Sequence, residues 1–327
     1  MNAVATTHKT NTFKWLLKRE FWENRGGFFW APVITGGIVA VLYSLLALIG
    51  SIAGRSKLKF DGDIINETPE KIARSLGAYG DGVLMGGIIL TCIVLAFVVF
   101  FYALGTLYDD RRDRSVLFWK SLPVSDTSTV LSKLAWALGL APVIAVIVGV
   151  ALGLVLWVVS ALTLTVNGLP AGSAVFTHSH PLRVIGGVLA SLPVYVLWAL
   201  PTVGWLMFCS AWARSKPFLW AVLVPVLGCV IISMMGILPG LEIPHNKIWY
   251  IVAFRGLLSA VPGAWLAADG RDSFQTGDAE TTLNGLNQFN GDSWHMLGTL
   301  DLWIGVVVGV ALIVAAIRLR RWRELAD

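Results

Sequence analysis

The chain has 327 residues, of which 56% are hydrophobic and 14% charged, and its mean hydropathy is +0.72. Soluble domains carry roughly 25% charged residues, so this composition excludes an ordinary soluble domain and favours a chain embedded in a bilayer. The net charge is +5, but Lys and Arg gather at the ends of apolar runs, which is typical of membrane proteins rather than of nucleic-acid binding. We therefore expect lipid surroundings, no nucleic-acid partner and one transmembrane domain over residues 1–327.

The first element in chain order is a predicted amphipathic helix over residues 13–25. At helical spacing most of its apolar side chains share one face and its basic side chains share another, as in helices that lie in a membrane interface. Glu20 and Asn24 interrupt the apolar face, so this is either a plain anchor helix or a helix that contacts a protein partner through these side chains. The residues of interest in this segment are Phe13, Leu17, Glu20, Phe21 and Asn24.

Six apolar runs follow, each close to the length of about 20 residues that a spanning helix needs. Inside them, Asp301 at the edge of the last run is the only Asp, Glu, Lys or Arg. The sequence therefore predicts an all-α polytopic membrane protein with six transmembrane helices. The runs cover residues 28–50, 82–105, 134–162, 184–212, 218–238 and 300–317.

The loop between the second and third runs, residues 108–133, has an unusual composition. A dense group of charges is followed directly by four large apolar side chains, and Pro123 then breaks the segment. Such an apolar run at a surface should bury against lipid or against a partner protein. The residues that this pattern selects are Asp109, Asp110, Arg111, Arg112, Asp113, Arg114, Val116, Leu117, Phe118 and Trp119.

Lys and Arg are concentrated in the N-terminal segment, in the loop after the second run, in the short loop after the fourth run and in the C-terminal tail. Because cytoplasmic segments are enriched in these residues, we expect both termini to be cytoplasmic. The stretch 248–268 is apolar but is interrupted by Arg255, Gly256, Pro262 and Gly263. An unbroken span there would place the Arg-rich tail outside, so we expect a re-entrant outer segment before the last span, buried against protein.

Nucleotide-binding and metal-binding residues are the remaining signs of function to look for in the sequence. The sequence has no GxxxxGK[ST] phosphate loop, and its nearest stretch, GSIAGRSK at residues 50–57, has the wrong spacing and lacks the lysine. We therefore expect no catalytic, cofactor or metal site in this chain. The alternative is a membrane-embedded enzyme or a metal-handling protein that uses histidines of the outer loops. These histidines are His178, His180, His245 and His295.

Two segments resemble the type-2 permeases of ABC exporters. They are KREFWENR, just before the first apolar run, and the stretch from Asp109 to Lys133 with its core DRRDRSVLFWKSLPVS. The resemblance implies that the first segment is the elbow helix, and that the loop after the second span is the coupling helix that docks on an ATPase. The outer loops are long for this family, so the resemblance implies no particular substrate.

The same resemblance implies a set of partners and a location. This chain would be the permease subunit, and an ABC ATPase subunit would be a separate chain that holds ATP and Mg. A second permease chain, giving a homodimer, would complete the pathway. Localisation would be the bacterial cytoplasmic (inner) membrane.

Overall fold

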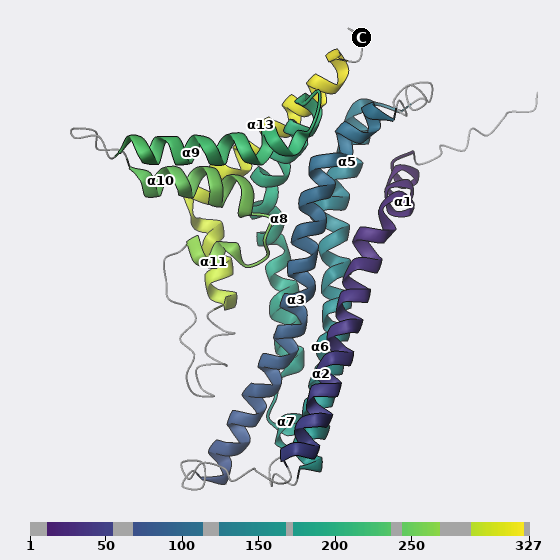
Figure 1. The fold of residues 1–327 in the computed structure, drawn as a ribbon, viewed down its shortest axis with the longest axis vertical. Coiled ribbons are helices and arrows are strands. Elements are labelled where there is room, and N and C mark those ends of the chain that lie inside the picture. The colour runs from purple at the N-terminus through teal and green to yellow at the C-terminus, as the bar shows by residue number, and fades with distance from the viewer. Residues whose placement is uncertain are drawn as a thin grey trace, which may run out of the picture.

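The structure is a computed structural model, and it describes residues 12–54, 68–113, 124–167, 173–236, 244–268 and 289–323. Within these ranges the regular structure is helical, without strands. The long helices are α2 (Ala31–Gly54), α3 (Pro69–Arg112), α6 (Ala141–Val166), α8 (Pro181–Trp212) and α13 (Leu300–Arg323). Figure 1 shows α2, α3, α6 and α8 running side by side along the long axis, with α13 tilted against them.

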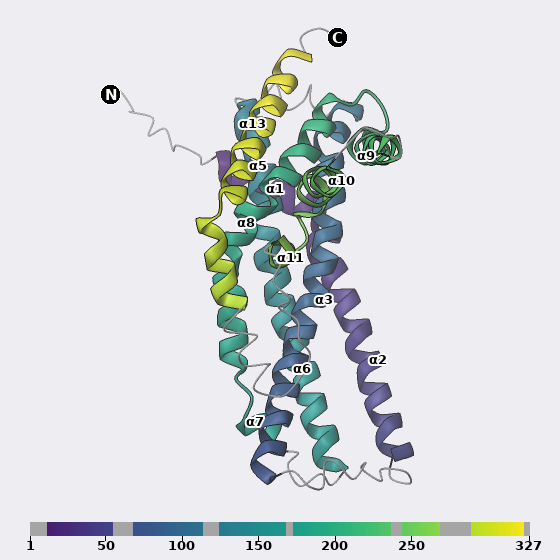
Figure 2. The same ribbon diagram turned by 90° about the vertical axis from the view of Figure 1, so that its left-hand side faces the viewer.

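Two of these helices are extended at one end through π-helical turns. Helix α1 (Thr12–Arg25) leads through η1 (Gly26–Trp30) into α2, and α5 (Asp126–Ala135) leads through η2 (Trp136–Leu140) into α6. Figures 1 and 2 show α1 turned across the bundle instead of continuing along the axis of α2. The predicted elbow is therefore a separate arm of the first helix, although its position in a membrane interface stays a prediction.

Five helices are long and apolar enough to cross a membrane, so the described chain has the architecture of a multi-pass membrane protein. They are Thr12–Ala53, Pro69–Arg112, Asp126–Val166, Pro181–Trp212 and Leu300–Trp322. They contain five of the six predicted apolar runs. The sequence thus predicted the all-α class and these five long helices correctly.

The described part of the sixth predicted run, which was predicted over residues 218–238, contains a shorter helix. It consists of η3 (Leu219–Leu223) and α9 (Val224–Met235). Figure 1 shows α9 crossing the direction of the long helices, and Figure 2 shows it nearly end-on. A helix in this orientation does not add a crossing parallel to the others, so the count of six spans stays a prediction.

The chain turns back after α9 and then breaks. Helix α10 (His245–Trp249) and the π-helical η4 (Tyr250–Leu258) pack against α9, and α11 (Ala264–Ala268) follows a break that contains Gly263. Gly263 has φ +85°, a conformation that suits glycine. Figure 1 places α9 and α10 toward the end of the bundle that carries α1 and α5, away from the short helix α7 (Ala174–Thr177). This is the end predicted to be cytoplasmic, so the start of the broken segment does not lie on the outer side that was predicted for it.

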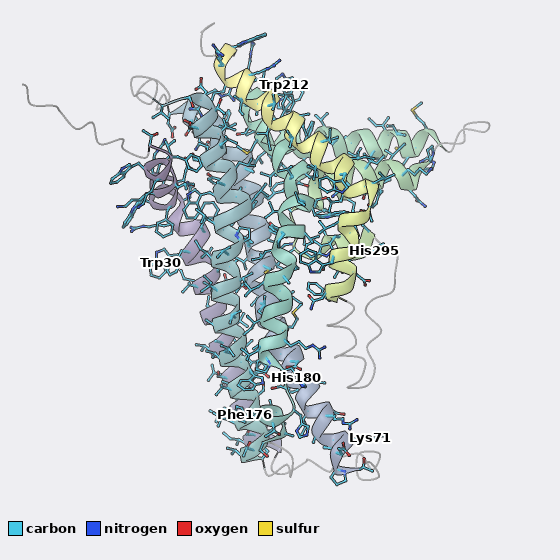
Figure 3. The ribbon with its side chains drawn as sticks, turned by 180° about the vertical axis from the view of Figure 1, so that it is seen from behind. Trp30, Lys71, Phe176, His180, Trp212 and His295 are labelled. Carbon is cyan, nitrogen blue, oxygen red and sulfur yellow. The ribbon has the colours of Figure 1, made fainter. Side chains whose placement is uncertain are left out.

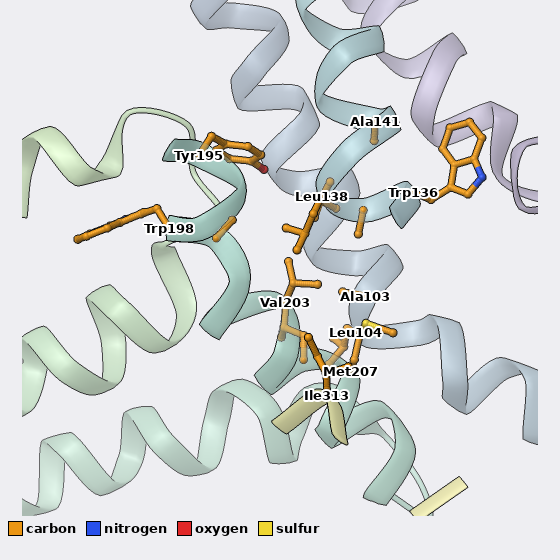
Figure 4. Close-up of a cluster of buried hydrophobic side chains, with 14 of the residues drawn as sticks. Ala103, Leu104, Trp136, Leu138, Ala141, Tyr195, Trp198, Val203, Met207 and Ile313 are labelled. Atoms are coloured by element: carbon orange, nitrogen blue, oxygen red, sulfur yellow. The ribbon is translucent and has the colours of Figure 1, made fainter. Parts of the chain in front are cut away.

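The bundle core forms where α3 packs on α6 and α8, and where α8 packs on α13. At two crossings glycines let the backbones approach closely, as is common between membrane helices. A Cβ on Gly87 would lie 2.6 Å from Gly153 Cα, and a Cβ on Gly204 would lie 2.7 Å from Gly309 O. Figure 4 shows apolar side chains that fill the core, contributed by α3, η2, α6, α8 and α13.

Helix α2 lies at the periphery and contacts mainly α6 and α3. Its large apolar side chains, such as Leu46 and Ile52, are 68% and 70% exposed. A soluble protein would not leave such a continuous apolar surface in water. This surface is what a helix in contact with lipid, or with another membrane helix, requires.

Candidate functional site

The predicted elbow residues lie against the start of the α5–α6 helix. The Trp136 ring stacks on Phe21 and on Phe28, with ring centroids 5.6 and 5.4 Å apart. Its indole Nε1 donates a hydrogen bond of 2.6 Å to the Leu17 carbonyl oxygen. Phe13, by contrast, is exposed at the first turn of α1. The apolar face predicted for this helix therefore packs on Trp136 through Leu17 and Phe21.

Glu20, which interrupts that apolar face, is fully buried within the chain. Its Oε1 lies 3.1 Å from the Lys133 ammonium nitrogen of α5, and its Oε2 accepts a 2.7 Å hydrogen bond from the Tyr102 hydroxyl of α3. Lys133 also donates to Thr106 Oγ1 at 2.9 Å. Asn24 donates to the Glu20 carbonyl oxygen, one turn earlier in the same helix. Both polar residues of the predicted stripe thus find partners inside this chain.

Asp110 of α3 continues these contacts toward α13. Its carboxylate lies 3.5 Å from Lys133 Nζ, 3.2 Å from Arg320 Nη1 and 4.0 Å from Arg19 Nη2. Arg320 also places its Nε 3.3 Å from the carboxylate of Asp126. We refer to the whole set as the ionic network: Arg19, Glu20, Asp110, Asp126, Lys133 and Arg320.

The ionic network ties four helices together at one end of the bundle. It contains three carboxylates and three cations, from α1, α3, α5 and α13. A buried charge without an opposite charge is strongly unfavourable, whereas a fully paired set is tolerated. The four helix ends therefore favour one mutual arrangement, because separating any of them would leave a buried charge uncompensated.

The network flanks the segment that was predicted to couple to an ATPase. Asp110, itself one of the predicted coupling residues, lies buried in the last turns of α3, and Asp126 follows the predicted contact in the first turn of α5. Ser125 caps α5 by accepting a hydrogen bond from the Ser128 N–H at 3.1 Å. Both ends of the segment are thus fixed to the bundle at defined points.

The coupling residues that the structure describes belong to the end of α3. Arg111 donates to the carbonyl oxygens of Ser210 and Ala213, at 2.6 and 3.0 Å, at the end of α8. Asp109, Arg112 and Asp113 are exposed. The remaining predicted coupling residues lie outside the described residues, so their arrangement stays a prediction. They are Arg114, Val116, Leu117, Phe118 and Trp119.

Sequence reasoning missed the partners of Glu20 and Asp110. Lys133 and Arg320 were read only as markers of the cytoplasmic side, and Tyr102 was one aromatic residue within an apolar run. The available signal was a carboxylate on an otherwise apolar helix face, since such a group needs a buried cation. Several cations were predicted on the same side of the membrane, so the sequence did not identify which of them pairs with it.

A second buried charge lies where the broken segment meets α8 and α13. The Arg255 side chain is 7% exposed, and its Cζ lies 3.6 Å from the centroid of the Trp198 ring. Its Nη atoms donate to Trp198 O, Ser259 Oγ and Asp301 O at 3.1 to 3.3 Å. In Figure 4 the Trp198 ring points away from the labelled apolar side chains of the core.

Asp301 supplies the opposite charge at the edge of this arrangement. Its carboxylate lies 3.6 Å from Arg255 Nε and accepts a 2.5 Å hydrogen bond from the Tyr250 hydroxyl. Burial, and then the hydrogen bond to Asp301, raise the pKa of Tyr250, so the phenol keeps its proton and acts as the donor. We call Tyr250, Arg255, Ser259 and Asp301 the arginine hook. It holds η4 against α8 and the first turn of α13.

Two histidines of the metal-binding alternative, His178 and His180, have different partners. His180 lies 3.7 Å from Asp81, whereas His178 contacts Thr177. Figure 3 shows His180 near the end of the molecule that carries Lys71, with His295 farther along the bundle. In the ranges that the structure describes, no group of three or more His, Cys, Asp or Glu side chains is arranged to hold a metal ion.

Comparison with known proteins leaves the chain without an assigned family. No family model matches it, and neither a curated protein nor a solved structure gave a significant match.

Proposed function

We propose that this chain is the membrane permease subunit of an ATP-driven ABC exporter in the bacterial cytoplasmic membrane. The observation that carries the proposal is the ionic network, which holds Asp110 and Asp126, on either side of residues 114–123, to the helix bundle. The resemblance of that segment to a coupling helix is the reason for proposing an ABC exporter. A docking segment is useful only if its movement reaches the helices, and the network provides a route for it.

The route can be followed helix by helix. A displacement of the segment pulls on Asp110 at one end and on Asp126 at the other, and both carboxylates pair with Arg320 of α13. Asp110 also pairs with Lys133, which holds Glu20 of α1. Because the charges are buried, the helices move together rather than separating. A push from a partner would thus tilt α1, α3, α5 and α13 as a unit.

The energy for this movement would come from another chain. The sequence contains no phosphate loop, so ATP and Mg would be held by a separate ATPase subunit. Two permease chains, forming a homodimer, would then enclose the transport pathway between them. In this proposal the chain is a transporter subunit and not itself an enzyme.

The decisive experiment removes the aromatic side chains of the segment. We expect Phe118→Ala and Trp119→Ala, singly and together, to reduce recovery of an ABC ATPase when the tagged chain is purified from its native membranes. Truncating a buried aromatic anchor costs about 2 kcal/mol, which is roughly a 30-fold loss of affinity. Mass spectrometry would identify the ATPase, and its ATP turnover in the complex would be measured alongside.

The matched control is Phe176→Ala, which removes an exposed aromatic side chain at the other end of the molecule (Figure 3). This variant should keep the ATPase, and all variants should still enter the membrane. If the Phe118 and Trp119 double variant assembles and turns over ATP like the unaltered chain, the coupling assignment is wrong. The exporter proposal then loses its main support.

A further inference from the structure

A cavity of about 420 Å³ lies beside the arm that carries the ionic network, between the α1–η1 junction and the middle of α3. Its volume falls within the usual range for small-molecule sites. Nine described residues line it, and they divide into a polar group from α1 and an apolar group from η1 and α3. The residues are Glu23, Asn24, Gly26, Gly27, Phe28, Phe97, Val98, Phe101 and Tyr102.

The cavity is open toward the surface that faces the bilayer. Phe97 and Phe101 on its rim are 64% and 58% exposed, and both lie in the apolar part of the candidate span α3. Gly26 and Gly27 leave the opposite wall without side chains, and a Cβ on Gly26 would meet no atom within 4 Å. A molecule that enters here would come from the membrane, because exposed Phe97 and Phe101 border the opening.

The polar end of the cavity presents a carboxylate. Glu23 is the one charged residue among the nine that line it. Its Oε1 pairs with Arg19 at 2.7 Å, and its side chain remains 46% exposed. A carboxylate has about four acceptor positions, so one partner leaves capacity for a second donor. An ammonium group can donate to this carboxylate, whereas a headgroup that presents only phosphate and hydroxyl groups brings no cation to it.

We propose that this cavity binds a membrane phospholipid whose headgroup carries a primary ammonium group. The ammonium contacts Glu23 and the start of an acyl chain lies over Phe97 and Phe101, so polar and apolar parts of the lipid meet matching walls. The remainder of the lipid stays in the bilayer. This site is separate from the proposed ATPase contact and does not depend on it.

Occupancy of the site also bears on the ionic network. Tyr102 lines the cavity and donates to Glu20, and Asn24 lines it and donates to the Glu20 backbone. A lipid wedged between α1 and α3 therefore supports the orientation of Glu20 toward Lys133. The bound lipid would stabilise the arm formed by α1 in the position seen here.

Photo-crosslinking tests the site on the full chain, reconstituted in phosphatidylglycerol vesicles without any ATPase. The two probes are phosphatidylethanolamine and phosphatidylglycerol, each with a diazirine in one acyl chain, and mass spectrometry maps the labelled residues. The phosphatidylethanolamine probe should label the stretch 97–102 about fivefold more than the phosphatidylglycerol probe. This is the ratio of affinities expected from one partly exposed ion pair.

Two variants with matched controls locate the label. Gly26→Leu fills the cavity and should abolish the preference, whereas Gly37→Leu in α2 should not, since Gly37 is also exposed and equally free of contacts. Glu23→Gln removes only the charge and should equalise the two probes. Its control is Glu70→Gln, which alters an exposed carboxylate with the same spacing to an arginine.

Each outcome decides the proposal. Equal labelling by the two probes in the unaltered chain would mean ordinary lipid contact and would overturn it. A preference that survives Gly26→Leu would place the lipid elsewhere and overturn it as well. Because Glu23→Gln keeps the shape of an exposed side chain, its result stands even if Gly26→Leu fails to fold. Failure here leaves the exporter proposal untouched, since no ATPase is present in the experiment.

Discussion

The ionic network and the arginine hook both bury charge, but they satisfy it in different ways. In the network, carboxylates and cations from four helices neutralise one another. In the hook, Arg255 is held mainly by neutral groups, namely two carbonyl oxygens, a hydroxyl and the Trp198 ring, with Asp301 at its edge. The network therefore depends on distant helices staying together, whereas the hook depends on the local fold of one broken segment.

This difference suggests different tasks. A set of mutually neutralising charges moves as a unit or not at all, which suits the passage of a movement between helix ends. An arginine surrounded by carbonyl oxygens closes a local structure and needs no motion of the bundle. Substitutions in the two regions should therefore differ both in the size of their effect and in how far that effect spreads.

The largest effect is expected for Lys133→Met. Methionine fills much of the same volume but leaves the buried Glu20 carboxylate without its cation, and breaking a buried ion pair in this way costs about 3 to 5 kcal/mol. Unfolding of the purified protein in detergent would measure the loss. Hydrogen exchange should rise together in α1, the end of α3, α5 and the end of α13.

The double variant Glu20→Gln with Lys133→Met serves as the control. The amide that replaces the Glu20 carboxylate can still accept a hydrogen bond from Tyr102. Neither position of the former ion pair then carries a buried charge, so much of the stability should return. If the single variant is as stable as the unaltered chain, the network does not hold these helices. An increase in exchange confined to α5 would likewise contradict the collective behaviour.

The sequence predicted the backbone of this region better than its contacts. Periodicity predicted a helix over residues 13–25, which α1 (Thr12–Arg25) confirms, and Ser125 caps the start of α5. Pairing within the network was beyond the sequence, because Glu20, Asp110, Lys133 and Arg320 come from four separate helices. Side-chain spacing specifies neighbours within one helix, whereas neighbours across helices depend on how the helices pack.

The α9 region shows a different limit of prediction from sequence. Residues 218–238 have the composition of a spanning helix, yet α9 crosses the direction of the long helices (Figures 1 and 2). Hydrophobicity measures how favourably a segment leaves water, and it does not specify an orientation relative to neighbouring helices. Arg255 was noted as an interruption of the next apolar stretch, but Trp198 and Asp301 as its partners follow only from the packing.

A smaller and more local effect is expected for Arg255→Lys. Lysine keeps the charge but replaces the planar guanidinium, which donates in several directions and stacks on Trp198, with a single ammonium. Loss of charge-assisted hydrogen bonds should cost about 2 kcal/mol. Hydrogen exchange should rise in residues 245–268 and remain unchanged in α1 and α5. An equal rise in those helices would remove the distinction between the two regions.

The smallest effect is expected for Arg74→Ala, because Arg74 lies outside both the ionic network and the arginine hook. Arg74 and Glu70 form an ion pair of 2.6 Å with side chains 55% and 72% exposed. The distance is shorter than any ion pair in the network, but water screens the charges, and such helix pairs contribute about 0.3 to 0.5 kcal/mol. Unfolding should therefore shift hardly at all, while Lys133→Met shifts it strongly. A comparable loss of stability in both variants would mean that pairing distance, rather than burial, determines how much these ion pairs contribute. The buried ionic network would then hold the helices together no better than an exposed ion pair does.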